Sequence, residues 1–357
     1  MEQAIFSFSL VGAPVSCKPF GTGHVNRTFL VETDAGRRYI LQRINHYAFR
    51  DVPGLMENVT AICRFLSLRT SDPREYLHLA PVLGGGDYIK DKKGNYWRVF
   101  DYVENSVCLD APETPEDFYQ SAVAFGRFQR LLRDFPAVAL HETIPNFHNT
   151  PDRYRIFHQV LEKDPRDRAK TAGPEIDFAL AHEAEAGLLL ARKEAGILPL
   201  RVTHNDTKLN NVMLDADTHR ALCVIDLDTA MPGLAAYDFG DAIRFGASTG
   251  PEDEPDLSKI SLDLDLYRIF TRGFVSACGG LTEAELESLP LGAKLMTLEC
   301  GVRFLTDYLD GDPYFATDYA GHNLARARTQ FKLVRDMEAK WDALCEIVRE
   351  AAAEANG

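Results

Sequence analysis

The chain has 357 residues, of which 45% are hydrophobic, and it carries 39 Lys and Arg against 53 Asp and Glu. That apolar fraction is ordinary for a globular protein and excludes a disordered or collagen-like chain, while the length predicts roughly two or three core-forming units. The formal net charge of -14 argues against a broad basic surface for nucleic acid or for anionic membranes.

The first hundred residues are predicted to form a small β-rich lobe that carries one helix. Runs rich in β-branched and aromatic residues predict strands over residues 15–20, 28–33, 37–42, 87–90 and 96–103. Asp34-Ala35-Gly36 provides a tight turn between the second and third of these strands. An amphipathic helix begins at Pro53 and runs through Leu68, with apolar residues at helical spacing.

From Thr114 onward the pattern is helical, which predicts a larger second lobe. Thr114-Pro115 offers an N-cap and a proline in the first turn, and Thr282 with Glu285 forms a capping box. Further helices are predicted to begin at Thr150 and Pro174 and to cover residues 323–353, with short strands over residues 201–203, 212–214 and 221–225. Because the periodicity breaks at residues 104–115, the predicted domains are residues 1–104 and 105–357.

The most informative segment is VTHNDTKLNNV, at residues 202–212. It contains His-x-Asp ending at Asp206, and Asn211 follows five residues later. Phosphoryl transfer to a hydroxyl needs a carboxylate that orients the acceptor and takes its proton, together with a side-chain oxygen that holds Mg²⁺. We therefore predict that Asp206 is the catalytic base and that Asn211 is a metal ligand.

A second metal ligand is predicted at Asp226, which follows directly after an apolar strand over residues 221–225. Asp228 is predicted either to support that ligand or to bind substrate. Asp238-Phe239-Gly240 spells a motif that protein kinases use for their metal ligand, but no predicted strand precedes it. We interpret Asp238 instead as a brace that accepts hydrogen bonds from His204 or from backbone amides of the catalytic segment.

These motifs resemble the aminoglycoside phosphotransferase and choline kinase superfamily. Within it, the segments VTHNDTKLNN, IDLDTAMPG, DFGDAIRFGAST and ECGVRFLTDYLDGDPYFAT resemble the N-acetylhexosamine 1-kinases, over nearly the whole chain. The resemblance implies an α+β, bilobal protein-kinase-like fold, with a small β-rich N-terminal lobe that binds nucleotide and a larger, mainly helical C-terminal lobe that holds the catalytic and sugar sites. The implied activity is ATP-dependent, Mg²⁺-dependent phosphorylation of the anomeric hydroxyl of N-acetylglucosamine or N-acetylgalactosamine.

The nucleotide side of the predicted site begins with FGTGHVNRT, at residues 20–28. Its two glycines allow the backbone to approach phosphates closely, and neighbouring amides can cradle them. The resemblance places Asn26 and Thr28 in the nucleotide loop and lets His24 reach the sugar. The edge of adenine is expected to meet the backbone at residues 102–104. The predicted nucleotide-binding residues are Gly21, Gly23, Asn26, Thr28, Gln42, Tyr102 and Val103.

Gln42 is a departure from the superfamily, which usually has lysine at this strand position. An uncharged amide cannot neutralise phosphate charge, so either Arg43 substitutes or Mg²⁺ and the loop amides suffice. Glu57, on the following helix, is the positional candidate for the partner of that lysine. The departure also supports an alternative, a catalytically silent nucleotide-binding protein, which the presence of the predicted base and both metal ligands opposes.

Arg244 and Arg303 are the candidate acceptor contacts, because an arginine among apolar neighbours must pair or reach water. For Arg244 a salt bridge to Asp238 or Asp241 is the alternative to sugar contact. For Arg303 the resemblance favours sugar contact, with the nearby Tyr308, Tyr314 and Phe315 as an aromatic platform. The predicted substrate-binding residues are His24, Asp206, Asp228, Arg244 and Arg303.

The competing enzyme hypothesis is a kinase of another small alcohol, such as homoserine, choline, methylthioribose or an aminoglycoside. The expected partners are ATP and a small sugar, with no nucleic acid, membrane or protein partner. A cytoplasmic protein is expected, because Glu2 stands where a secretory signal needs positive charge, and no run of about 18 apolar residues occurs.

Overall fold

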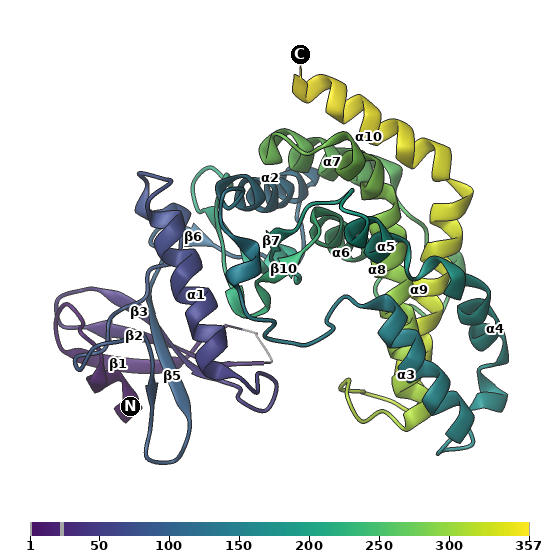
Figure 1. Ribbon diagram of the computed structural model, residues 1–357. Helices are drawn as coiled ribbons and strands as arrows, with labels where there is room; N and C mark the ends of the chain where they lie inside the picture. Colours follow the sequence, from purple (N-terminus) through teal and green to yellow (C-terminus); the bar gives the residue numbers. More distant parts are fainter. Residues whose placement is uncertain (1, 22–24, 357) are drawn as a thin grey trace. The chain divides into compact units, whose positions relative to one another are not determined.

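The computed structural model describes residues 2–21 and 25–356, and the chain divides into two compact units (Figure 1). The first unit contains Met1–Cys108, Leu131–Pro145 and Asn211–Pro232, and the second contains Leu109–Arg130, Asn146–Asn210 and Gly233–Gly357. Two segments that lie beyond the predicted boundary therefore belong to the first unit, and one of them carries Asn211 and Asp226.

The first unit is built on a five-stranded antiparallel sheet in the order β1-β2-β3-β5-β4. Its strands are β1 (Pro14–Pro19), β2 (Arg27–Thr33), β3 (Arg38–Ile44), β4 (Ile89–Lys90) and β5 (Tyr96–Asp101). Each predicted strand is confirmed to within two residues at either end. A second, three-stranded sheet has the order β6-β8-β9, formed by β6 (Ser106–Val107), β8 (Val212–Asp215) and β9 (Ala221–Val224).

The predicted helix of the first unit is α1 (Val52–Ser67), which lies across the five-stranded sheet (Figure 1). It begins where predicted because the Asp51 side chain accepts a hydrogen bond from the Gly54 amide and Pro53 occupies the first turn.

The two faces of the sheet differ in chemistry, because side chains alternate along a strand. One face packs into an apolar core that contains Leu41 and Val99, which lie opposite each other in the β3/β5 register. The next pair along, Gln42 and Arg98, points to the other face, where Met56 of α1 lies 3.9 Å from the Arg98 guanidinium. A polar cross-strand pair therefore faces the helix.

The second unit is mainly helical and is organised around the long helix α8 (Glu283–Asp310), which packs against α6, α9 and α3 (Figure 1). Its helices are α2 (Pro115–Leu131), α3 (Thr150–Lys163), α4 (Gly173–His182), α5 (Leu188–Glu194), α6 (Ala235–Gly246), α7 (Leu264–Cys278), α8, α9 (His322–Ala339) and α10 (Trp341–Asn356). The remaining strands of the described chain are β7 (Arg201–Thr203) and β10 (Met231–Gly233). Across residues 2–21 and 25–356, no helix combines the length and apolarity needed to cross a bilayer.

Close packing of α6 on α8 depends on two glycines. A Cβ atom added at Gly240 would lie 2.3 Å from the carbonyl oxygen of Gly292, and one added at Gly292 would lie 2.3 Å from the carbonyl oxygen of Ala236. The helices therefore approach backbone to backbone, which fixes the position of the Asp238-Phe239-Gly240 segment. The predicted capping box of Thr282 and Glu285 is confirmed at the start of α8.

Asp336 of α9 fixes the loop before α7, and this contact gives a pH-dependent prediction. Its carboxylate accepts hydrogen bonds from the Ser261 hydroxyl (2.9 Å), the Leu262 amide (2.7 Å) and the Lys340 ammonium (2.7 Å). Burial opposes ionisation, but these donors, the Lys340 ammonium foremost, outweigh it and lower the pKa of the Asp336 carboxyl.

Asp336→Asn is expected to lower the free energy of unfolding by about 1–2 kcal/mol at pH 7. Because the native pKa lies below the unfolded value of about 3.9, the carboxylate contributes fully above that pH and loses its contribution as the pH falls through the native pKa. Thermal unfolding of both proteins at pH 7 and at about pH 3 checks this. A difference in melting temperature that stays constant with pH would contradict it.

Candidate active site

The catalytic segment of the second unit is braced by a fully buried carboxylate. Asp238 of α6 accepts hydrogen bonds from the amides of His204 (3.0 Å) and Asn205 (2.8 Å) and from the Gln129 side chain (2.6 Å). Burial raises the pKa of the Asp238 carboxyl, and the two amides act against that rise. These hydrogen bonds confirm the interpretation of Asp238 as a brace. A short strand, β10, does precede the Asp238-Phe239-Gly240 segment, contrary to the sequence prediction, but the segment itself lies inside helix α6.

A second carboxylate of α6, Asp241, holds the other side of the segment. It accepts a hydrogen bond from the Thr207 amide (2.9 Å) and pairs with Arg244, whose Nη2 lies 2.9 Å from Asp241 Oδ1. Arg244 also pairs with Glu252 at 2.8 Å, and its side chain is 8% exposed. The ion pair with Asp241 that was the alternative for Arg244 is therefore present, and sugar contact by Arg244 stays a prediction.

Asp206 projects from this braced segment with its side chain 32% exposed. Its amide donates to Nδ1 of His204, whose buried ring packs against Phe125. The Lys208 ammonium lies 3.0 Å from the Asp206 carboxylate. Burial lowers the pKa of the Lys208 ammonium, but the carboxylates of Asp206 and Asp241 outweigh burial and raise it. Sequence reasoning missed Lys208, although its place two residues after Asp206 was the available signal.

The predicted metal ligands Asn211 and Asp226 lie at the same end of the β8/β9 hairpin in the first unit. Val212 pairs with Val224, and the Ile225 amide donates to the Asn211 carbonyl at 2.8 Å, so Asp226 follows directly. The Asp226 backbone is left-handed, with φ 58°, and the residue is exposed. A non-glycine residue holds that conformation only where its surroundings fix it, which is frequent at functional sites. A carboxylate and an amide oxygen together suit a hard cation such as Mg²⁺.

Three of the predicted nucleotide residues, Asn26, Thr28 and Gln42, are linked in the first unit through Arg98, which sequence reasoning missed, and Asp228. Asn26 donates to Asp228 (2.6 Å), Gln42 donates to Thr28 (3.2 Å), and Arg98 contacts both Gln42 (3.0 Å) and Asp228 (2.5 Å). Asp228, predicted as a substrate contact, is therefore ion-paired inside the first unit. The available signal for Arg98 was a lone arginine between Trp97 and Val99 in a predicted strand.

The remaining nucleotide predictions have ordinary local partners. Gly21 has φ 77° and open space around it, while Gly23 and His24 lie outside the described residues. The Tyr102 ring is covered by the Arg38 guanidinium at 4.1 Å, and the Val103 carbonyl accepts from the Ser106 hydroxyl at 2.6 Å. Glu57 of α1, the candidate partner of the absent lysine, pairs with His141 at 2.7 Å.

Arg303 of α8 lies among aromatic rings. Its guanidinium is 5.9 Å from the ring centres of Phe147 and Tyr314 and 5.3 Å from that of Phe315. None of the ion pairs within 4.0 Å among the described residues includes Arg303, although, against the effect of burial, its charge helps to lower the pKa of the buried Glu299 carboxyl, one turn away. Tyr308, expected in the same platform, instead covers Arg168 at 4.7 Å.

One turn of α8 before Arg303, the buried Glu299 accepts from the Thr150 hydroxyl (2.7 Å) and lies 3.1 Å from His148 Nδ1. Asn149 caps α3, as expected for a helix entry, by accepting from the Asp152 amide. The entry to α3 is therefore tied to the helix that carries Arg303.

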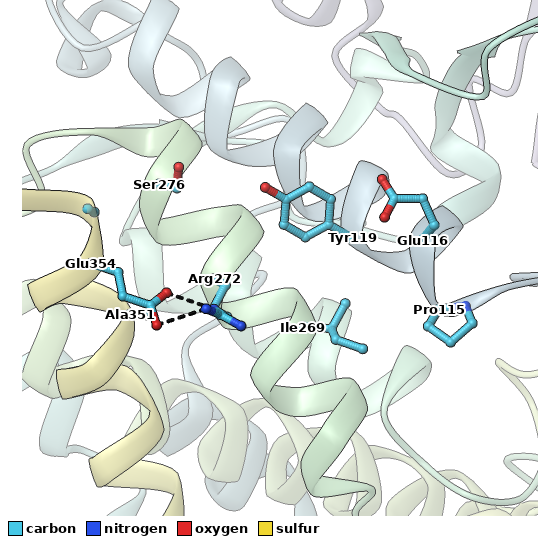
Figure 2. Close-up of a pocket in the computed structure, with 9 residues that line it drawn as sticks. Pro115, Glu116, Tyr119, Ile269, Arg272, Ser276, Ala351 and Glu354 are labelled. Atoms are coloured by element: carbon cyan, nitrogen blue, oxygen red, sulfur yellow. Dashed lines mark hydrogen bonds and ion pairs between the residues drawn. The ribbon is translucent and has the colours of Figure 1, made fainter.

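A separate surface pocket of the second unit lies among α2, α7 and α10 (Figure 2). Figure 2 shows Tyr119 and Ile269 facing this pocket, and the ion pair of Arg272 with Glu354 (2.7 Å) bounding it. No predicted catalytic, metal, nucleotide or acceptor residue lines it.

Comparison with known proteins is consistent with this geometry. A model described as the phosphotransferase enzyme family (APH) matches residues 16–268, and the chain belongs to that family. The chain is similar in structure to an aminoglycoside phosphotransferase from Alicyclobacillus acidocaldarius, with a TM-score of 0.60 and 13% identity. The alignment covers 99% of this chain and 95% of that chain.

Two further solved structures share the fold. A microcompartment-associated aminopropanol kinase gives a TM-score of 0.57 and 17% identity, with 96% of this chain and 97% of that chain covered. An amicoumacin kinase in complex with AMP-PNP, Ca²⁺ and Ami gives a TM-score of 0.58 and 14% identity, with 92% of this chain and 90% of that chain covered. The predicted fold class, a bilobal kinase-like fold in which an antiparallel sheet is followed by a mainly helical region, is confirmed.

Proposed function

We propose that this phosphotransferase transfers the γ-phosphoryl group of ATP to the anomeric hydroxyl of an N-acetylhexosamine, forming the sugar 1-phosphate. The observation that carries the proposal is the braced segment around Asp206. Asp238 and Asp241 accept hydrogen bonds from the backbone amides on either side of Asp206, so the backbone that carries the partly exposed Asp206 carboxylate is fixed by buried neighbours. Such preorganisation is what general-base catalysis requires.

In the proposed reaction Asp206 orients the anomeric hydroxyl and accepts its proton. The hydroxyl oxygen forms a bond to the γ-phosphorus, the bond from that phosphorus to the β,γ-bridging oxygen breaks, and ADP leaves with the bonding electron pair. Asn211 and Asp226 would hold Mg²⁺, which when bound neutralises charge on the phosphates. Lys208, 3.0 Å from Asp206, places a positive charge beside the reacting groups.

The chemistry around Arg303 supports a neutral sugar as acceptor. A guanidinium offers several donors to hydroxyl and acetamide oxygens, and the Tyr314 and Phe315 rings offer apolar faces to the C–H groups of a pyranose. A cationic acceptor such as choline or an aminoglycoside needs an acidic or aromatic cage and would be repelled by an arginine. The resemblance of the segments around residues 238–249 and 299–317 to N-acetylhexosamine 1-kinases adds to this choice.

Phosphorus NMR of the protein with ATP, Mg²⁺ and N-acetylglucosamine or N-acetylgalactosamine tests the proposal. A new sugar 1-phosphate signal is the expected result. If ATP stays intact with both sugars but is consumed with homoserine, choline, methylthioribose or an aminoglycoside, the acceptor is wrong and the phosphotransfer stands. No consumption with any acceptor would instead favour a silent nucleotide-binding protein.

Arg303→Met is expected to raise KM for the sugar roughly 10–100-fold, the range for losing charge-assisted hydrogen bonds, with KM for ATP nearly unchanged. Steady-state kinetics with each substrate varied in turn measures both constants. Arg335→Met is the matched control, because Arg335 also stacks on an aromatic ring, that of Phe178 at 4.7 Å. Equal KM values for the sugar in the two variants would refute the contact.

A further inference from the structure

Arg98 of β5 is a buried cation that the proposed function leaves unexplained. Its side chain is 1% exposed, and its Nη1 lies 2.5 Å from Oδ1 of Asp228, whose side chain is 2% exposed. A charge so far from water needs a partner of opposite sign, because neither ion alone recovers its lost hydration. Asp228 is that partner, and it lies two residues after the predicted metal ligand Asp226.

The ion pair joins two parts of the first unit that are distant in sequence. On one side, Arg98 Nε donates to Gln42 Oε1 at 3.0 Å, and Gln42 donates onward to the Thr28 hydroxyl. On the other side, Asp228 Oδ2 accepts from Asn26 at 2.6 Å. One guanidinium therefore connects β3 and the start of β2 to the turn that follows β9.

That turn has a backbone that needs support. Asp226 is left-handed, and Asp228 lies in the single 3₁₀ turn Leu227–Thr229 that follows it. Besides the contacts of its carboxylate, Asp228 accepts a hydrogen bond at its carbonyl from the Thr143 hydroxyl at 2.9 Å. Because the Asp226 side chain leaves the same short turn, anchoring Asp228 sets the direction in which the Asp226 carboxylate points.

We propose that Arg98 is a positioning residue: acting through Asp228, it holds the Asp226 carboxylate in the orientation that binds Mg²⁺. This role rests on the proposed function. Because the Arg98 guanidinium is buried and ion-paired with Asp228, we do not expect it to bind the nucleotide directly. Its effect on nucleotide binding is expected to arise from its effect on the metal site. Gln42, which has no charge, serves as the acceptor that aligns the guanidinium. Outer partners of this kind typically change metal affinity roughly 10–100-fold when removed.

The test is isothermal titration of AMP-PNP into the protein with Mg²⁺ and, separately, with EDTA. In Arg98→Met the gain in AMP-PNP affinity on adding Mg²⁺ is expected to fall roughly 10–100-fold, with the affinity in EDTA nearly unchanged. Asp228→Asn is expected to lose as much, and the double variant no more than either single one, because the two side chains act as one unit. Arg98→Lys is expected to retain part of the gain.

Lys294→Met is the matched control, since Lys294 of α8 is a similarly buried cation, 9% exposed and paired with Glu185 and Glu338. It is expected to lower the melting temperature and leave the Mg²⁺ gain unchanged. If Arg98→Met fails to fold, Arg98→Lys and Asp228→Asn carry the same test.

An unchanged Mg²⁺ gain in Asp228→Asn or in folded Arg98→Met would overturn the role. The role would also be overturned if AMP-PNP affinity fell as much in EDTA as with Mg²⁺, because that result would mean that Arg98 contacts the phosphates directly. Wild-type protein that binds no AMP-PNP would contradict the proposed function itself.

Discussion

Asp206→Asn is expected to reduce kcat roughly 10²–10⁴-fold, the usual contribution of a general base. The amide has nearly the same shape as the carboxylate but cannot accept the proton of the acceptor hydroxyl. The fold is expected to survive, because the backbone of this segment is held by Asp238 and Asp241. Asp206→Asn weakens the ion pair with Lys208, and pairs this exposed are worth little.

The measurement is steady-state formation of ADP with the sugar acceptor, alongside thermal unfolding of the same preparation. Asp265→Asn is a suitable control, because Asp265 is an exposed aspartate in the first turn of α7. A near-wild-type kcat for Asp206→Asn would show that Asp206 is not the base. A large drop in its melting temperature would show that the carboxylate also supports the loop.

The strands of the five-stranded sheet and α1 could be predicted because their signals are local, whereas the two-residue strand β6 (Ser106–Val107) is too short to leave one. Alternation of apolar residues marks each strand, and Asp51 with Pro53 marks the start of α1. The carboxylate after β9 could be predicted in the same way, since an apolar strand followed by Asp-x-Asp is visible in the sequence.

The Arg98 cluster could not be predicted, because it depends on cross-strand register. Nothing local relates Arg98 to Gln42, which lies 56 positions away, or shows that both face α1. The compensating cation was therefore predicted at Arg43, the neighbour of Gln42 in the sequence. In the structure the buried cation is instead Arg98, the residue opposite Gln42 on the adjacent strand β5. Side-chain periodicity indicates which residues share a face, but the partner on the next strand follows only from the register.

The domain prediction differs from the observed units for a similar reason. A boundary read from broken periodicity is a single point, whereas the observed first unit recruits two later segments. One of them, Leu131–Pro145, is held to α1 by a reciprocal pair of hydrogen bonds, in which Asn58 donates to the His141 carbonyl and accepts from the His141 amide, each at 2.9 Å. Phe135 also packs edge-on against Phe65 at 5.1 Å. Such contacts leave no mark in hydrophobic periodicity.

Asp226→Ala is expected to impair Mg²⁺ binding and Asp238→Ala to impair stability, although each aspartate stands in a sequence motif that is typical of a metal ligand. Asp226 is exposed at the end of a hairpin, so its loss is expected to abolish the Mg²⁺-dependent part of AMP-PNP binding and leave the melting temperature within a few degrees of wild type. Asp238 is fully buried with three donors directed at it. Its loss leaves those donors unsatisfied, which is expected to cost about 3 kcal/mol or more.

Titration of AMP-PNP at varied Mg²⁺, together with thermal unfolding, separates the two roles. The geometry favours this outcome, because a ligand needs an accessible oxygen and the Asp238 oxygens accept from the backbone of the segment they brace. Equal Mg²⁺ dependence in wild type and Asp226→Ala would remove Asp226 from the metal site. If Asp238→Ala alone lost the Mg²⁺ dependence while still folded, the metal would belong to the Asp238-Phe239-Gly240 segment. The support that Arg98 gives to the turn after β9 would then serve stability and not the nucleotide.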